Sequence, residues 1–350
     1  MSVLIDISHP AHVHFYRPLA QALIADGTAV HTIARNKDVT VELLEATGLP
    51  FEVLPMTRPG AGRTSAAVEL LRRSWALRRR IQLNNVKVVL TRNPSGAIAA
   101  FGTRATSIFD TVDGRHVGMH YWGARPFADI VTSSVHDPEN HGRNHCRYPG
   151  LREQMALHPN RFTPNYRVRR RYFSDDESYS AVRFSAHDAT HDRSIKGLSR
   201  DARQAVLKKL KPFGPVLLSV EREGLCLQRA DSKPVNVAPW DFHQLLSQAA
   251  LFVGDSQSVA AEAAVLGVPA LRLSSFSGRL FYLTHLESEG LLQNFLPGEE
   301  DRLLREVDNV LENPEQCRAT SVMRAESLRE RSGDIAAWYL ELIRAQLAVR

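Results

Sequence analysis

The feature that most constrains the fold of this chain is a regular alternation of short apolar segments with longer helix-like ones. Segments 3–7, 29–34 and 86–90 are short and apolar, and apolar residues recur at helical spacing in stretches between such segments. Strands that alternate with helices in this way predict a parallel, doubly wound sheet. The expected fold class is therefore α/β.

The alternation lapses once, between about Pro149 and Asp176, where prolines and clustered arginines replace the periodic pattern. Such a stretch is typical of a domain junction, and 350 residues are many for a single core. We expect two Rossmann-like domains, over residues 1–170 and 171–333, and an amphipathic helix over 334–350. Ligands of open α/β sheets bind at the carboxyl ends of the strands, so a cleft between the two sheets is the predicted binding site.

Several classes of protein are excluded or disfavoured by simple counts. No apolar run approaches the roughly 20 residues of a membrane span, and the opening MSVLIDISHPAH is typical of a first strand rather than a signal peptide. The three cysteines lie far apart without a C-x-x-C pair, which disfavours a zinc ribbon and suits a reducing compartment. We expect a cytoplasmic protein.

The net charge of +6 is compatible with a nucleic acid, an anionic membrane or a phosphorylated small molecule as partner. No aromatic-studded surface typical of nucleic-acid binding is evident. A basic segment around Trp75 predicts a cationic amphipathic helix, whose alternatives are a solvated face and peripheral contact with an anionic membrane. Its arginines are Arg72, Arg73, Arg78, Arg79 and Arg80.

The most informative local motif is the strand–turn–helix pattern of residues 251–273, in which Gly254-Asp255-Ser256 opens an alanine-rich helix. Gly254 permits close approach of a ligand to the backbone, and Ser256 or Ser258 can cap the helix, whose start suits a diphosphate. Glu262 lies about 9 Å further along the helix axis, within reach of an attached ribose. The alternative is a purely structural cap with a solvated glutamate. The alanines around Glu262 predict a buried helix, where a carboxylate needs a partner.

Three histidines, His9, His12 and His14, follow the first predicted strand and are suited to general base catalysis. On a helix, His12 and His14 point in nearly opposite directions, which disfavours a shared metal. Satisfied polar histidines near a helix start are the alternative.

The run 182–192 follows the first strand of the second domain and contains H-D-x-x-H-D. No further cluster completes a metal site, so Arg183, Ser185 and His187 are predicted to contact phosphate or sugar instead. Other polar residues also follow predicted strands. They are Glu221 and Arg222, Asp110, Asp113 and His116, and the segment Arg92–Ser95.

Three motifs occur in order: H-P-A-H-V-H-F, V-R-F-S-A-H-D-A-T-H-D and G-D-S-x-S-x-x-x-E-A-A-x-L-G-V-P-A. With them the chain resembles, over nearly its whole length, an uncharacterised prokaryotic family of predicted B-type (GT-B) glycosyltransferases. The last motif is shared more loosely with sugar-nucleotide transferases and the non-hydrolysing UDP-N-acetylglucosamine 2-epimerase. The resemblance implies that the second domain binds a nucleotide sugar, the first provides the acceptor side, and the final helix packs back on the first.

The resemblance also implies roles for individual residues: Glu262 binds the ribose, the turn containing Ser256 holds the pyrophosphate, and His14 faces the acceptor. Together with the residue patterns, it gives two sets of candidates. The candidate catalytic residues are His14, Asp110 and His187. The candidate substrate-binding residues are His12, Arg183, Ser185, Glu221, Arg222, Gly254, Asp255, Ser256, Ser258 and Glu262.

The leading hypothesis is a metal-independent glycosyltransferase that moves a sugar from a nucleotide diphosphate sugar to a glycan, lipid or small-molecule acceptor. It has no cofactor other than this co-substrate. A sugar-nucleotide 2-epimerase, with Asp110, Asp113 and His187 around the sugar, is the alternative. A periplasmic type of binding protein is disfavoured because no signal peptide is evident, and an NAD-dependent dehydrogenase because no G-x-G-x-x-G follows a strand.

Overall fold

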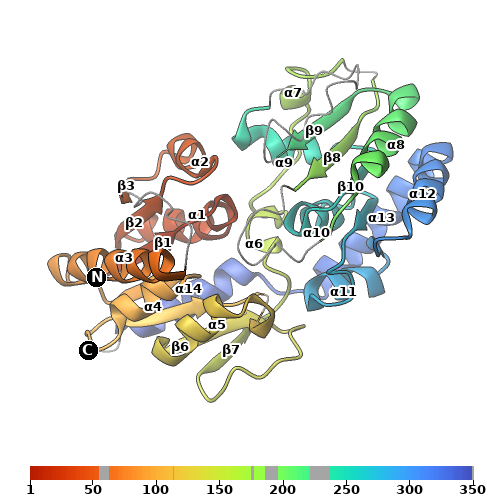
Figure 1. Cartoon of the computed structure of the whole chain (residues 1–350). Coiled ribbons are helices and arrows are strands. Elements are labelled where there is room, and N and C mark those ends of the chain that lie inside the picture. Colours follow the sequence, from red (N-terminus) through yellow and green to blue (C-terminus); the bar gives the residue numbers. More distant parts are fainter. Residues whose placement is uncertain (55–62, 113, 175–176, 186–195, 221–236, 349–350) are drawn as a thin grey trace. The chain divides into compact units, whose positions relative to one another are not determined.

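The computed structural model describes residues 1–54, 63–112, 114–174, 177–185, 196–220 and 237–348. The chain forms two compact units (Figure 1), of which the first comprises Met1–His158 and Gly333–Arg350 and the second Pro159–Ser332. The sequence placed the junction near residue 170, later than the structure does. Residues 159–170 belong to the second unit, where Asn165 N donates a 2.6 Å hydrogen bond to Gln244 Oε1.

The first unit is built on a parallel sheet with the strand order β3-β2-β1-β4-β5-β6-β7 in the described part of the chain. β1 is central and pairs with both β2 and β4, so the strand order reverses there, as in a doubly wound sheet. The strands are β1 (Ser2–Ile7), β2 (Ala29–Arg35), β3 (Phe51–Leu54), β4 (Val88–Thr91), β5 (Thr106–Asp110), β6 (Ile130–Ser134) and β7 (His145–Tyr148).

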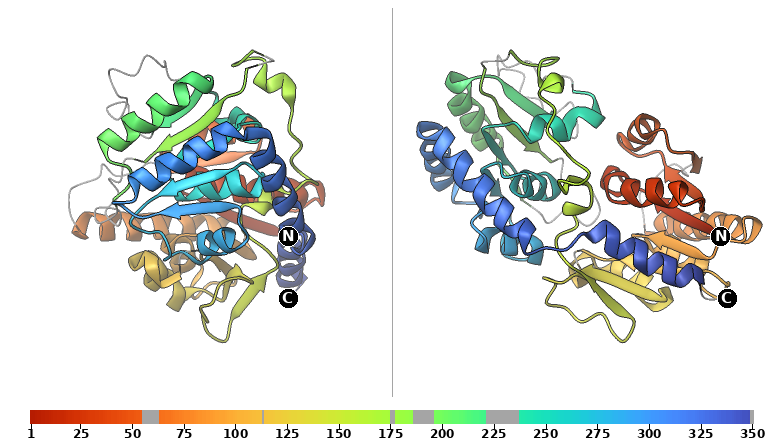
Figure 2. Two further views of the ribbon diagram at one scale, coloured as in Figure 1. Left: turned by 90° about the vertical axis from the view of Figure 1, so that its right-hand side faces the viewer. Right: turned by 180° about the vertical axis from the view of Figure 1, so that it is seen from behind.

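Helices cover both faces of this sheet because successive strand residues point to opposite sides. Val3 and Ile5 pack with Ile343 in one hydrophobic core, whereas Leu4 packs with Leu77 in another. Figure 2 shows the last helix lying along the first unit. The helices are α1 (Pro10–Ala25), α2 (Thr40–Thr47), α3 (Arg63–Leu83), α4 (Pro94–Ala100), α5 (Met119–Ala124), α6 (Gln154–Leu157) and α14 (Ile335–Ala348).

The second unit has a smaller parallel sheet with the order β12-β11-β10-β8-β9. Its strands are β8 (Ser180–Phe184), β9 (Val216–Val220), β10 (Leu251–Gly254), β11 (Ala270–Leu273) and β12 (Leu292–Phe295). Val253 and Leu271 pack with Leu207 of α8 and Leu303 of α12 in a hydrophobic core. The helices are α7 (Tyr166–Arg169), α8 (Arg200–Leu210), α9 (Phe242–Leu246), α10 (Gln257–Val265), α11 (Phe281–Ser288), α12 (Glu300–Glu312) and α13 (Pro314–Glu330).

The predicted parallel α/β architecture is confirmed in both units. The strands expected at 216–220, 251–254 and 270–273 coincide with β9, β10 and β11. The sequence did not reveal β7, β12 or α13. Over the residues described, no helix combines the length and the hydropathy that crossing a membrane requires.

Candidate functional site

The turn between β10 and α10 lies at the carboxyl edge of the smaller sheet, as its sequence predicted. Ser256 adopts an extended backbone conformation and caps α10, and its side chain accepts a 3.5 Å hydrogen bond from Val259 N. The cap leaves other N–H groups of the first turn without an intrahelical acceptor, and the helix dipole adds positive potential there. This end of α10 therefore has the electrostatics of an anion site.

Asp255 is buried in this turn and is held by two groups of the second unit. One carboxylate oxygen accepts a hydrogen bond from Ser185 N at 2.6 Å, and the other pairs with Arg203 Nη2 at 3.1 Å. Since both oxygens are engaged by the protein, Asp255 fixes the turn and the end of β8 relative to α8. Its predicted contact with a substrate stays a prediction.

Gly254 lies against the backbone of the neighbouring strand β8, whereas its sequence context suggested that a ligand approaches it. A Cβ atom at this position would lie 2.3 Å from the carbonyl oxygen of Arg183, on the paired strand β8. Packing of β10 against β8 thus requires glycine here, whereas the prediction from the sequence was that glycine allows a ligand to approach the backbone.

Glu262 is directed into the second unit rather than into water. Its carboxylate lies 3.2 Å from Nε2 of His243 on α9, and the two side chains are only 13% and 11% exposed. Ser258 precedes Glu262 by four residues, so both lie on the same half-buried face of α10. The partner predicted for the Glu262 carboxylate is thus His243, a residue that was not among the sequence-based candidates.

Arg183 and Ser185 lie at the end of β8, beside the same turn. The guanidinium of Arg183 is half-buried and donates a hydrogen bond from Nη1 to Ser219 Oγ. Arg183 is paired in register with Gly254. Three further residues that the sequence predicted for the site, His187, Glu221 and Arg222, lie outside the described residues.

The three histidines near the N-terminus lie at the start of α1 in the first unit. His9 caps the helix by accepting a hydrogen bond from Ala11 N at 3.2 Å. His12 is buried, and its Nδ1 accepts a 3.4 Å hydrogen bond from Ser8 N. Burial, followed by the nearby charge of Arg92, lowers the pKa of His12 well below its ordinary value. His12 is therefore neutral near pH 7, and His14, two residues further along the helix, is half-buried.

Asp110, a predicted base at the end of β5, is buried and contacts three side chains. Its Oδ1 accepts hydrogen bonds from Tyr339 Oη at 2.9 Å and Thr132 Oγ1 at 3.4 Å, and its Oδ2 pairs with Arg92 Nε at 3.1 Å. Burial raises the pKa of Asp110 while these partners oppose the rise. This arrangement anchors α14 to the sheet, while Oδ2 accepts no hydrogen bond from the residues described. Asp113 lies outside the described residues.

A second buried acid, Asp6 at the end of β1, went unnoticed in the sequence. Its Oδ1 pairs with Arg73 Nη2 of α3 at 2.5 Å, and its Oδ2 accepts hydrogen bonds from Thr91 Oγ1 at 3.1 Å and Ser95 Oγ at 3.2 Å. The placement of Arg73 on a membrane-facing surface is therefore wrong: its side chain is buried and joins α3 to the sheet.

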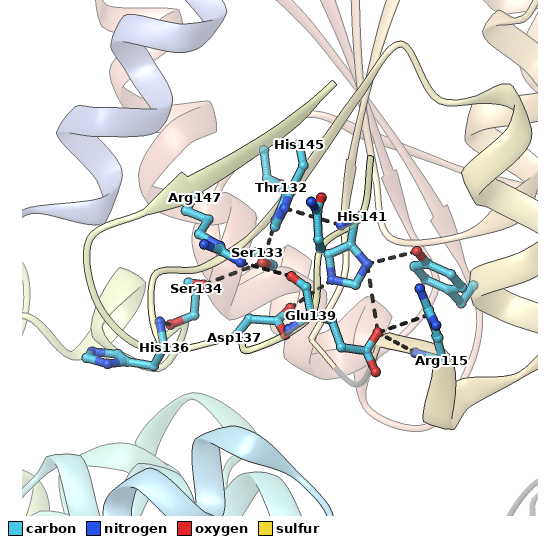
Figure 3. Close-up of polar contacts among 12 residues, drawn as sticks. Arg115, Thr132, Ser133, Ser134, His136, Asp137, Glu139, His141, His145 and Arg147 are labelled. Atoms are coloured by element: carbon cyan, nitrogen blue, oxygen red, sulfur yellow. Dashed lines mark hydrogen bonds and ion pairs between the residues drawn. The ribbon is translucent and has the colours of Figure 1, made fainter. Parts of the chain in front are cut away.

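A polar network between β6 and β7 was not predicted from the sequence (Figure 3). His141 Nε2 lies 2.8 Å from Asp137 Oδ2, and its Nδ1 lies 2.8 Å from Tyr121 Oη. Burial raises the pKa of Asp137, but the bond to His141 and others outweigh it and leave that pKa lowered. The segment His136–His145 carries the signal, since four of its ten residues are His or Asp and one is Glu.

His145 of the same network bonds to Ser133, with 2.8 Å between Nε2 and Oγ. Burial lowers the pKa of His145 to about 4, so the ring is neutral near pH 7. Its Nδ1 accepts a hydrogen bond from His141 N at 3.4 Å, which places the ring proton on Nε2. His145 therefore donates to Ser133 and does not activate it as a nucleophile. Among the residues described, no group of three or more His, Cys, Asp or Glu side chains has an arrangement that would hold a metal ion.

No family model and no curated protein sequence matches the chain. Several solved structures are similar to it in fold. The UDP-GlcNAc 2-epimerase from Neisseria meningitidis bound to UDP-GlcNAc has a TM-score of 0.72 at 12% identity, covering 100% of both chains. MnaA from S. aureus, solved with UDP, has a TM-score of 0.69 at 12% identity and covers 97% of both chains. The glycosyltransferase VinC in complex with dTDP has a TM-score of 0.61 at 14% identity and covers 99% of both chains.

At these identities the similarity concerns the fold, and it extends over both units. The order of strands in the two parallel sheets agrees with that conclusion. The chain has the GT-B fold and is distantly similar to the UDP-GlcNAc 2-epimerases.

Proposed function

We propose that the chain binds a nucleoside diphosphate sugar at the carboxyl edge of the second unit's sheet and transfers the sugar to an acceptor. The observation that carries the proposal is the pairing of Glu262 with His243 on a helix capped by Ser256. A diphosphate is stabilised at the start of α10, and the carboxylate held by His243 accepts hydrogen bonds from the ribose hydroxyls. The similar structures solved with UDP, UDP-GlcNAc and dTDP support this ligand class.

The leaving diphosphate develops negative charge, which needs a positive group nearby. Arg183 is paired in register with Gly254, the residue just before the turn. A guanidinium forms strong, charge-assisted hydrogen bonds with phosphate oxygens. In the proposed reaction Arg183 and the start of α10 stabilise the diphosphate as the glycosidic bond breaks, a role that requires no metal ion.

Transfer to a hydroxyl acceptor also requires one general base, and the proposed base is His14 at the start of α1. Epimerisation requires groups that remove and return a proton at the sugar carbon. Asp110, which the sequence suggested for that role, is engaged by Arg92, Tyr339 and Thr132. Its Oδ2 makes the ion pair with Arg92 but accepts no hydrogen bond from the residues described, so Asp110 does not decide between the two reactions.

The second candidate function is 2-epimerisation of a nucleotide sugar. It is supported by the higher TM-score with the N. meningitidis epimerase, 0.72, than with the glycosyltransferase VinC, 0.61. Both candidates share the same donor site and differ in what happens to the sugar.

Calorimetric titration with UDP, dTDP and UDP-GlcNAc tests the donor site. Glu262→Ala should weaken binding about 10-fold or more, because hydrogen bonds to a charged group contribute about 1.5–3 kcal/mol. Glu326→Ala is the matched control, since Glu326 is an exposed glutamate on another helix of the same unit. Wild-type protein that binds none of the three ligands would contradict the proposal.

Incubation with UDP-GlcNAc in deuterated water separates the two candidate reactions. Epimerisation without any acceptor gives an isomer of the sugar nucleotide that carries deuterium at C2, which NMR detects. Transfer gives UDP release that rises when an oligosaccharide or polyprenyl phosphate acceptor is added and that falls in His14→Ala.

A further inference from the structure

The outward face of α3 is a surface that the proposed reaction does not use. The inward side of this helix is fastened to the first unit: Leu77 and Ile81 are buried in a hydrophobic core, and Arg73 pairs with Asp6. These contacts fix the rotation of α3 about its axis. The residues on the opposite side must therefore point outward.

Those residues include large apolar side chains. Val68, Leu71 and Trp75 are 47%, 64% and 65% exposed. Their spacing of three and four residues puts them in one stripe along the helix. Phe101, also exposed, lies beside α3, because Arg78 Nη1 donates a 2.6 Å hydrogen bond to its carbonyl oxygen. Clustered exposed apolar side chains of this size mark a surface that binds something.

The charges around the stripe all have one sign. Arg72 and Arg79 are exposed beside it, and the guanidinium of Arg79 lies 5.9 Å from the Trp75 ring centre. The single acidic residue in the sequence of α3, Glu69, is half-buried and lies 3.5 Å from Arg35. The outward face therefore presents apolar side chains flanked by arginines.

We propose that this face of α3, formed by Val68, Leu71, Arg72, Trp75 and Arg79, docks on an anionic lipid surface. Apolar side chains enter the interface between headgroups and acyl chains, and arginines beside them bind the lipid phosphates. Trp75 has the amphipathic ring that favours this depth. A second copy of the chain is a poorer partner, because the same face would oppose arginine to arginine. The inference goes beyond the proposed sugar transfer and does not depend on it.

Co-sedimentation with vesicles tests the inference. The full chain is mixed with vesicles of phosphatidylcholine alone, or of phosphatidylcholine and phosphatidylglycerol in equal parts. We expect binding to the mixed vesicles that falls with added salt. The double variant Arg72→Gln/Arg79→Gln should bind about 30-fold more weakly, equivalent to about 2 kcal/mol. Leu71→Ser/Trp75→Ala should also bind at least 10-fold more weakly.

The chain offers a matched control in Trp122. Its ring is 57% exposed and lies 5.9 Å from the guanidinium of Arg115, as Trp75 does from Arg79. Trp122→Ala should bind the mixed vesicles like wild type, and circular dichroism should show every variant folded. Equal binding to neutral vesicles, unchanged binding of the α3 variants, or no binding of the wild type would overturn the proposal. Selective capture of an acidic protein or RNA without vesicle binding would overturn it as well.

Discussion

The hydroxyl of Tyr339 donates a 2.9 Å hydrogen bond to Asp110 Oδ1 and so ties α14 to the end of β5. The same hydroxyl lies 2.6 Å from Thr132 Oγ1. Tyr339→Phe removes both contacts and leaves a buried carboxylate with one partner fewer. We expect the free energy of unfolding to fall by about 1–3 kcal/mol, measured by urea denaturation. Tyr166→Phe, at an exposed position, should change it by less than about 0.5 kcal/mol. Equal effects of the two substitutions would show that the Tyr339 hydroxyl contributes nothing.

Two buried arginines of the second unit should respond oppositely to substitution. Arg203 pairs with Asp255, so Arg203→Met removes the cation beside a buried carboxylate and should cost about 3–5 kcal/mol. Arg272 is fully buried, and its Nε and Nη2 have no hydrogen-bond partner among the residues that the structure describes. Within that part of the chain, Nη1 donates to Asn294 Oδ1 and Ser277 Oγ. Arg272→Met should therefore be neutral or stabilising. Thermal denaturation of both variants checks this, and a large loss of stability in Arg272→Met would contradict it.

Acid should destabilise the fold through two histidines whose pKa is lowered by burial, the partly buried His145 and the buried His12. Burial lowers the pKa of His145 from its ordinary value of 6.5 to about 4. As the pH falls through 6.5, the unfolded chain takes up a proton before the folded one does. The contribution of His145 to stability is therefore complete above about pH 6.5 and is lost as the pH falls toward 4. Burial also lowers the pKa of His12, which acts in the same direction.

The histidine effect can be isolated with one variant and one control. His145→Gln retains a hydrogen-bond donor for Ser133 but cannot titrate, so its unfolding free energy should fall less steeply between about pH 6.5 and 4 than that of the wild type. His116→Gln, at an exposed position, should leave the slope unchanged. Urea denaturation at several pH values gives the slopes. Parallel curves for His145→Gln and the wild type would rule out its contribution.

Gly254→Ala should reduce stability whether or not a ligand is present. The added methyl group would lie 2.3 Å from the Arg183 carbonyl oxygen, which belongs to the backbone of β8 and cannot move alone. Overpacking of this kind costs about 1–3 kcal/mol. Ser258→Ala, on the half-buried face of α10, is the comparison. A Gly254→Ala protein as stable as the wild type, but unable to bind UDP, would restore the ligand role that the sequence suggested.

The central strands were predictable because they are continuous apolar segments, and the polar edge strands were not. β10 reads Leu-Phe-Val-Gly and is buried throughout, whereas the edge strand β7 reads His-Cys-Arg-Tyr and β12 reads Leu-Gln-Asn-Phe. An edge strand has one open side, so polar residues are tolerated, and four residues are too few for an alternating pattern to emerge. α13 was missed for a related reason: only Ser321, Ala325 and Leu328 are buried along its length.

The candidate site was predictable as far as local chemistry determines it. The cap of α10 by Ser256 follows from adjacent residues, and the need of Glu262 for a partner follows from the alanines around it. The identity of that partner cannot be predicted from adjacent residues, because His243 lies on another helix. Asp6 and Arg73 are likewise 67 positions apart. Pairings of this range are set by the packing of helices on the sheet, which a single sequence does not display.

The division of the chain determines the order in which its parts can be completed during synthesis. The second unit is one continuous segment, Pro159–Ser332, and emerges whole from the ribosome. The core of the first unit includes Ile335, Tyr339 and Ile343 of α14, which are translated after that segment. Until α14 has been synthesised, the core of the first unit is incomplete and apolar side chains of the N-terminal part are exposed. A chaperone is most needed during this interval.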